Sequence, residues 1–148
     1  RVISKLIIGT KKKDKITGTY YDEILAGKDG KDILTGKGGF DGFLFDTPNS
    51  MGKKHADVIK DFDSGEGDSI LLGKGIFDIG NKITLKTVTG KKQAKKASRG
   101  NNTFIYDDNK GLLYFNENGK AKGWGDDGGL FTKLIGAPEL GASDFTIV

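Results

Sequence analysis

Two consecutive nonapeptides decide the fold: GKDGKDILT at residues 27–35 and GKGGFDGFL at residues 36–44. Each unit begins with glycine, carries an aspartate at its sixth position and a large apolar residue at its eighth. The same positions recur toward the N-terminus, in two degraded units that start at residues 9 and 18. The three series are Gly9, Gly18, Gly27 and Gly36; Asp14, Glu23, Asp32 and Asp41; and Ile16, Leu25, Leu34 and Phe43. Because glycine, acid and apolar residue recur together every nine residues, the sequence predicts a nonapeptide repeat.

The repeat indicates a chain of short turns and short strands. About six residues from each glycine form a turn and about three form a strand, so each unit buries one apolar side chain and only stacking can build a core. Stacked turns would align their carboxylates in a repelling column, and a cation between the turns would remove that repulsion. Hard oxygen ligands, without His or Cys, favour Ca²⁺ over Zn²⁺. The alternative is a set of ordinary Gly/Asp turns between antiparallel strands, since Asp side chains bind nearby backbone N–H groups.

These units resemble the glycine- and aspartate-rich nonapeptides of RTX (repeats-in-toxin) proteins. That family folds them as a parallel β-roll, in which two nonapeptides make one coil. The resemblance therefore implies that every second unit stacks on the same side of the roll, 9–17 on 27–35 and 18–26 on 36–44.

The resemblance also implies two Ca²⁺ sites between the stacked turns. Asp14 and Asp32 would share the first ion, and Glu23 and Asp41 would share the second. Turn carbonyls would complete the sites: those of Thr10, Lys12, Gly27 and Asp29 at the first, and those of Thr19, Tyr21, Gly36 and Gly38 at the second. The chain departs from the usually acidic family in its formal net charge of +4, with many lysines beside the acids. These lysines would neutralise part of the repulsion without calcium.

Residues 57–72 follow the repeats and read as strand, acidic glycine turn and strand. They resemble the block that follows the roll in many RTX proteins. Their acids Asp61, Asp63 and Asp68 are candidates for a further Ca²⁺ site, and a solvated hairpin turn is the alternative.

The C-terminal half also indicates β-structure. Residues 103–119 alternate apolar and polar side chains and predict a hairpin with its turn at 107–111. We therefore predict an all-β chain: a short parallel β-roll at 1–46, continuing into an antiparallel β cap at 47–148.

Several classes of site are excluded by composition. The chain has no Cys and a single His, His55, which leaves no disulfide, no thiolate metal site and no multi-His metal site. No apolar run is long enough to span a bilayer. We find no nucleophile elbow, no HExxH and no convincing carboxylate pair, so we do not expect an enzyme within these residues. Any catalysis is expected in a region upstream of this sequence.

The segment Lys82–Arg99 contains seven basic residues and no acid. It predicts either a patch for an acidic polysaccharide or another polyanionic surface, or a solvated loop. Nucleic acid is disfavoured as a partner, because the aromatic residues expected for base stacking are absent from the segment.

The chain ends in Ser143-Asp144-Phe145-Thr146-Ile147-Val148. An acid followed by an apolar carboxyl terminus resembles the uncleaved export signal of type I secretion substrates, such as the serralysin-like proteases. The resemblance implies transient recognition by an inner-membrane ABC transporter; the alternative is the last strand of the sandwich. We expect a calcium-folded C-terminal module of a secreted, extracellular RTX protein. A polyanion-binding module attached to an extracellular enzyme is the alternative.

Overall fold

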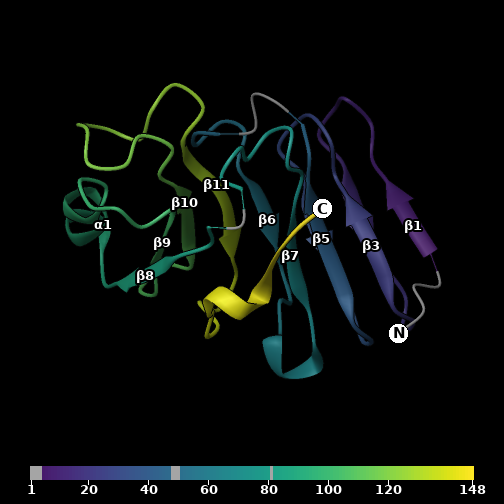
Figure 1. Ribbon diagram of the computed structural model, residues 1–148. Helices are drawn as coiled ribbons and strands as arrows, with labels where there is room; N and C mark the ends of the chain where they lie inside the picture. The colour runs from purple at the N-terminus through teal and green to yellow at the C-terminus, as the bar shows by residue number, and fades with distance from the viewer. Residues whose placement is uncertain (1–4, 48–50, 81) are drawn as a thin grey trace.

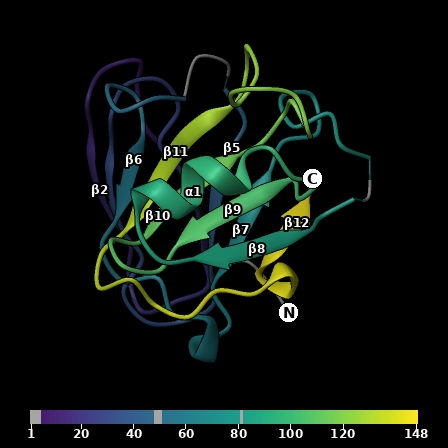
Figure 2. The same ribbon diagram turned by 90° about the vertical axis from the view of Figure 1, so that its left-hand side faces the viewer.

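The computed structural model describes residues 5–47, 51–80 and 82–148, which fold into two β-sheets packed face to face (Figures 1 and 2). Sheet A has five strands in the order β1 (Lys5–Ile8), β3 (Glu23–Ala26), β5 (Asp41–Phe45), β7 (Ser69–Leu72) and β12 (Phe145–Ile147). Sheet B has seven in the order β2 (Lys15–Thr17), β4 (Ile33–Thr35), β6 (Asp57–Ile59), β11 (Gly129–Leu134), β10 (Leu112–Phe115), β9 (Phe104–Asp107) and β8 (Leu85–Val88). The all-β prediction is confirmed.

The repeat region winds as a parallel roll, because successive strands alternate between the two sheets. Glu23 pairs in register with Lys5 on one side and Asp41 on the other, a step of two nonapeptides each time. Ile16 pairs with Leu34 at the same step in sheet B. The stacking of every second unit is therefore confirmed. The alternative interpretation, ordinary Gly/Asp turns between antiparallel strands, is wrong, because these strands pair in parallel.

The parallel stacking continues past residue 46. Strand β6 pairs with β4, so that Ile59 lies beside Leu34, and β7 pairs with β5, so that Ile70 lies beside Phe43. Residues 57–72 are thus a further coil, since β6 lies in sheet B, β7 lies in sheet A and the 3-10 turn Ser64–Glu66 joins them. The hairpin alternative for this block is wrong, because its two strands do not pair with each other.

The C-terminal half mixes antiparallel and parallel pairs. β9 and β10 form the hairpin predicted at 103–119, and β11 extends it as a third antiparallel strand. β11 also runs parallel to β6, which joins this half to the roll. A helix that the sequence reading did not expect, α1 (Lys91–Ala97), follows β8 and packs on β8 and β9 (Figure 2). No helix within the described ranges is long and apolar enough to cross a membrane.

The core grows along the roll and becomes aromatic at its C-terminal end. In sheet B each coil strand contributes one inward apolar side chain, namely Ile16, Leu34 and Ile59. In sheet A, β5 and β7 each contribute two. In the C-terminal half, Phe77 packs within 4.9 Å of Phe115 and 5.4 Å of Phe131, measured between ring centroids. The narrow coils therefore share a core with a much larger aromatic cluster.

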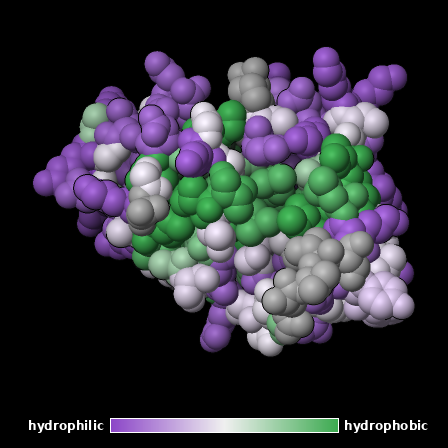
Figure 3. All heavy atoms as spheres, turned by 45° about the vertical axis from the view of Figure 1, so that its right-hand side comes forward, coloured by the Kyte–Doolittle hydropathy of each residue, from purple (hydrophilic) through white to green (hydrophobic). Residues whose placement is uncertain are grey.

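The outer face of sheet A is also apolar. Leu6 and Ile8 of β1 are 54% and 56% exposed, and Ile24, Leu44 and Leu71 are half-buried beside them. Figure 3 shows apolar side chains gathered in a band across this side of the molecule. Sheet A therefore lacks the clean alternation of apolar inward and polar outward residues typical of a sheet with one solvated face.

We predict that Phe43→Ala lowers the free energy of unfolding by about 3–5 kcal/mol, because the ring is fully buried and its loss leaves a cavity. Chemical denaturation measures the effect. The neighbouring Leu44→Ala, on the outer face of the same strand, is the matched control and should cost clearly less. Equal losses from the two variants would mean that Phe43 does not belong to a packed core.

Candidate metal centre

The two well-formed nonapeptides share one turn conformation. Lys28 and Lys37, at their second positions, have φ of 66° and 65°, and Gly30 and Gly39, at their fourth, have φ of 87° and 82°. The left-handed backbone at each fourth position favours glycine, which has no Cβ. The two turns thus repeat the same left-handed geometry along the chain.

The first glycine of each unit is required by the acid at the sixth position. A Cβ on Gly27 would collide with Oδ2 of Asp32, and a Cβ on Gly36 would collide with Oδ2 of Asp41. Each carboxylate therefore folds back over the start of its own turn. This contact explains why glycine and acid keep a fixed spacing in the sequence.

On the side of sheet B, three acids stand one above another on successive coils. Asp14 N–H donates to Oδ1 of Asp32 at 2.8 Å, and Asp32 N–H donates to Oδ1 of Asp57 at 2.8 Å. Asp14 itself accepts from Thr10 N–H at 2.6 Å. The predicted pair Asp14 and Asp32 is therefore brought together, and Asp57 extends the column.

A second column lies on the side of sheet A. Glu23 and Asp41 are paired in register, and Asp41 N–H donates to Oδ1 of Asp68 at 3.0 Å. Glu23 accepts from Thr19 N–H at 2.6 Å. The predicted pair Glu23 and Asp41 is thus also brought together, with Asp68 on the next coil.

The columns bury negative charge without counterions. Asp32, Asp41 and Glu23 are at most 1% exposed. Oδ2 of Asp32 and both carboxylate oxygens of Asp41 have no hydrogen-bond partner among the described residues. Among the described residues, no Lys or Arg forms an ion pair with the columns; Lys28 of the roll pairs instead with Asp46 at 2.9 Å. Burying a charge in this way is costly unless a proton or a cation neutralises it.

Burial is the largest cause of raised pKa values in both columns. It raises the pKa of Asp57 to about 8 and that of Asp41 to about 7. It raises the pKa of Asp32 and that of Asp68 to about 6. Neighbouring carboxylates raise the pKa further, as Asp68 and Glu23 do for Asp41. Burial therefore shifts these four carboxyl groups toward the neutral form.

Backbone carbonyls of one coil lie close to glycines of the neighbouring coil. The carbonyl oxygen of Gly27 lies against Gly9, and that of Lys12 lies against Gly30. In the second column the carbonyl of Gly36 lies against Gly18, and that of Tyr21 lies against Gly39. Four of the predicted carbonyl ligands are thus placed between stacked turns. The carbonyls of Thr10, Thr19, Asp29 and Gly38 remain predictions.

The residues present fit a hard cation such as Ca²⁺. Their donor set consists of carboxylate and carbonyl oxygens, which suit Ca²⁺ because it accepts six to eight oxygen ligands in flexible geometry. In the described ranges no group of three or more His, Cys, Asp or Glu side chains could hold a metal by itself. Any ion here would therefore depend on the turn carbonyls, with one or two carboxylates.

The acids of the 57–72 block have separate roles. Asp61 accepts from the N–H groups of Gly36 and Lys37 at 2.8 and 2.7 Å, and Asp63 accepts from Gly65 N–H at 2.9 Å. Both bind turn amides; Asp68 belongs to the sheet A column and also accepts from Asp63 N–H at 3.0 Å. A shared Ca²⁺ site for Asp61, Asp63 and Asp68 remains a prediction.

The sequence reading did not identify Asp57 and Asp68 as members of the columns. The sequence pattern that could have identified them is an acid two residues before a buried apolar residue. Asp57 precedes Ile59 in this way, as Asp32 precedes Leu34, and Asp68 precedes Ile70. The longer insertions before these acids hide the nonapeptide period.

Comparisons with known proteins find no family model that matches this chain and no curated protein of similar sequence. A similar solved structure is the solution structure of the AlgE6R3 subunit from the Azotobacter vinelandii mannuronan C5-epimerase. The two chains are 17% identical, with a TM-score of 0.49, and the alignment covers 99% of this chain and 84% of that one.

We predict that the metal-free protein becomes more stable as the pH falls from about 8 to about 5. The folded pKa values of about 6–8 lie above the unfolded value of 3.8. Stability from protonating these groups is fully present below the unfolded pKa and is lost as the pH rises through the folded values. Thermal unfolding in excess chelator measures it.

Asp41→Asn is the matched variant for this prediction, since it removes one titrating group and keeps the shape. Its unfolding temperature should depend less on pH than that of the wild type. A metal-free unfolding temperature that stays constant or falls toward about pH 5 would contradict the raised pKa values.

Proposed function

We propose that this chain is a calcium-binding module whose coils are stabilised by Ca²⁺ held between successive turns. One observation carries the proposal: buried Oδ2 of Asp32 and both carboxylate oxygens of Asp41 have no partner among the described residues, and carbonyls of the neighbouring coil lie close to the turns. Asp32 and Asp14 would hold one ion, and Asp41 and Glu23 the other. Bound Ca²⁺ supplies positive charge that the columns lack.

The free energy of Ca²⁺ binding would be comparable with the free energy of unfolding of a domain. Extracellular calcium modules bind with dissociation constants of about 10⁻⁴–10⁻³ M. A ligand that binds only the folded state adds about 2.7 kcal/mol per site at 100 times its dissociation constant. Domain stabilities are about 5–15 kcal/mol in total. Two such sites would therefore supply a large share of the stability of the roll.

We further propose that the chain belongs to a secreted protein exported by a type I ABC transporter. In the cytosol, where free Ca²⁺ is scarce, the carboxylate columns would oppose folding and leave the chain able to pass a narrow channel. Outside the cell, Asp32 and Asp41 would gain the neutralising ion, and folding would follow. Lys28, paired with Asp46 across the coils, lowers the repulsion only locally.

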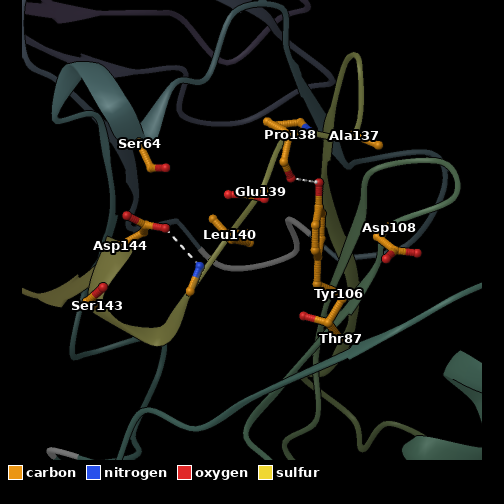
Figure 4. Close-up of a pocket in the computed structure, with 11 residues that line it drawn as sticks. Ser64, Thr87, Tyr106, Asp108, Ala137, Pro138, Glu139, Leu140, Ser143 and Asp144 are labelled. Carbon is orange, nitrogen blue, oxygen red and sulfur yellow. Dashed lines mark hydrogen bonds between the residues drawn. The ribbon is translucent and has the colours of Figure 1, made fainter.

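The C-terminal segment, which carries the proposed export signal, is docked in the folded module. Ser143 and Asp144 of this segment line a hollow of about 620 Å³. Figure 4 shows them across from Tyr106, whose hydroxyl donates to the Pro138 carbonyl; the bond is 2.6 Å long. Asp144 accepts from Gly141 N–H at 2.8 Å, and Phe145 stacks on Phe104 with 4.9 Å between ring centroids. A transporter would therefore have to read this segment before the module folds.

We predict that Asp32→Ala combined with Asp41→Ala abolishes most of the rise in unfolding temperature produced by Ca²⁺. The double variant removes the buried carboxylates that would hold the ions. Circular dichroism and thermal unfolding, with excess chelator, with Ca²⁺ and with equal Mg²⁺, measure the effect. The wild type should gain β-signal and stability with Ca²⁺ but not with Mg²⁺.

Asp29→Ala is the matched control. It removes an exposed carboxylate of the same turn that is not part of a column, and it keeps the backbone carbonyl that is the predicted ligand. It should preserve the response to Ca²⁺. A double variant that responds to Ca²⁺ as the wild type does would overturn the ligand assignment.

We predict that removal of Asp144–Val148 reduces export from a strain with a type I secretion system, because the truncated chain lacks the signal. The measurement is the amount of chain in the medium relative to the cell pellet. Phe104→Ala separates export from folding, since it leaves the tail unchanged but removes the ring on which Phe145 stacks. It should lower thermal stability and preserve export. Undiminished export of the truncated chain would contradict the proposed signal.

A further inference from the structure

A second apolar cluster lies outside the main core, between helix α1 and the outer face of sheet B. It consists of Val88, Ala94, Ile105 and Tyr114, with Trp124 packed against it. The rings of Tyr114 and Trp124 are stacked, with 4.6 Å between centroids and 7° between planes. The half-buried indole thus forms an aromatic platform at the molecular surface.

A cavity of about 340 Å³ opens beside this platform. Its volume is at the lower end of the range for small-molecule sites. Ala94, Tyr114 and Trp124 give it an apolar floor. Four cationic side chains also line it, and no described acidic residue does: Lys91, Lys95, Arg99 and Lys122. No described acidic residue forms an ion pair with any of the four. The cavity therefore combines an apolar floor with unneutralised positive charge.

The two walls of the cavity are held together by Asn116. Its side-chain Nδ2 donates to the carbonyls of Gly100 and Asn102, which follow the helix, at 3.1 and 3.2 Å. It also donates to the carbonyl of Gly119 in the opposite loop at 3.2 Å. Asn116 is 3% exposed, so these bonds are shielded from water. The cavity is thus formed before any ligand binds, which lowers the entropic cost of binding.

We propose that this cavity binds an anionic polysaccharide. The apolar face of a sugar ring would lie against Trp124, and its carboxylate or sulfate groups would pair with the lysines and Arg99. The planar guanidinium of Arg99 offers two parallel N–H donors to such a group, which gives orientation as well as attraction. The site is separate from the carboxylate columns of the roll.

A single-stranded nucleic acid fits this site less well. Proteins that bind it stack successive bases on several aromatic faces along a basic groove. The cavity offers one platform, because its two aromatic rings, those of Trp124 and Tyr114, are stacked on each other and not spaced along a groove. One platform ringed by cations matches a single charged sugar unit better than a run of bases.

Helix α1 provides its own control. Lys91 and Lys95 line the cavity, whereas the equally exposed Lys92 and Lys96 do not. Two double variants with the same change in charge can therefore be compared: Lys95→Ala with Arg99→Ala, and Lys92→Ala with Lys96→Ala. All four side chains are exposed, so neither variant removes a core contact.

The test is isothermal titration calorimetry of the full chain with three oligosaccharides, in a buffer that contains Ca²⁺ and about 0.15 M salt. These are a short oligogalacturonate, a heparin oligosaccharide and a neutral malto-oligosaccharide of similar length. We expect one or both anionic probes to bind and the neutral probe not to. Lys95→Ala with Arg99→Ala should weaken binding about ten-fold or more, because it removes two close charges, whereas Lys92→Ala with Lys96→Ala should weaken it less than about three-fold.

Trp124→Ala tests the platform and should weaken binding at high salt as well, since its contact is not screened. Circular dichroism verifies that each variant is folded. Equal losses from the two double variants would overturn the proposal in favour of diffuse charge attraction, and so would absence of binding to both anionic probes. Tighter binding of single-stranded oligothymidylate than of either sugar would overturn it in favour of nucleic acid.

Discussion

The structure depends on one constraint: acids at equivalent turn positions are buried one above another on successive coils. Three of these carboxylates have a structural task, since Asp32, Asp57 and Asp68 each accept a backbone N–H of the coil before them. The same stacking leaves Oδ2 of Asp32 and both oxygens of Asp41 without partners among the described residues. Hydrogen bonds from the carboxylates thus stabilise the stacking of the coils, whereas repulsion between the carboxylates destabilises it. Whatever neutralises the charge decides which effect prevails.

The C-terminal half compensates for the small core of the roll. A strand of the coils buries one or two large apolar side chains, whereas Phe77 and Phe131 belong to a cluster of several packed aromatic rings. Two parallel pairs connect these regions, because β11 extends sheet B beyond β6 and β12 extends sheet A beyond β7. The last coil of the roll is therefore covered on both sheets. This cover supplies the buried apolar area that the nonapeptides cannot supply themselves.

The sequence predicts the repeat region well, because glycine, acid and apolar residue are each fixed by a local contact of the turn. It predicts the β9–β10 hairpin for a similar reason, since alternation and a glycine turn are local signals. The coil formed by β6 and β7 was missed, because insertions before Asp57 and Asp68 make both pairing steps longer than two nonapeptides. Helix α1 was also missed. It starts after Gly90 without a side-chain cap, and its stability comes from packing Ala94 against β-strands that only the tertiary fold brings near.

The position of β12 has a consequence for the order of folding. Its pairing with β7 places Phe145 beside Ile70, a contact between residues that lie far apart in the sequence. Contacts of such high sequence separation slow folding, because a long loop must close before they form. Until residues 145–147 dock, β7 is an open edge of sheet A, and open edges can pair with other chains. Association of partly folded chains through β7 is therefore the hazard that this topology creates.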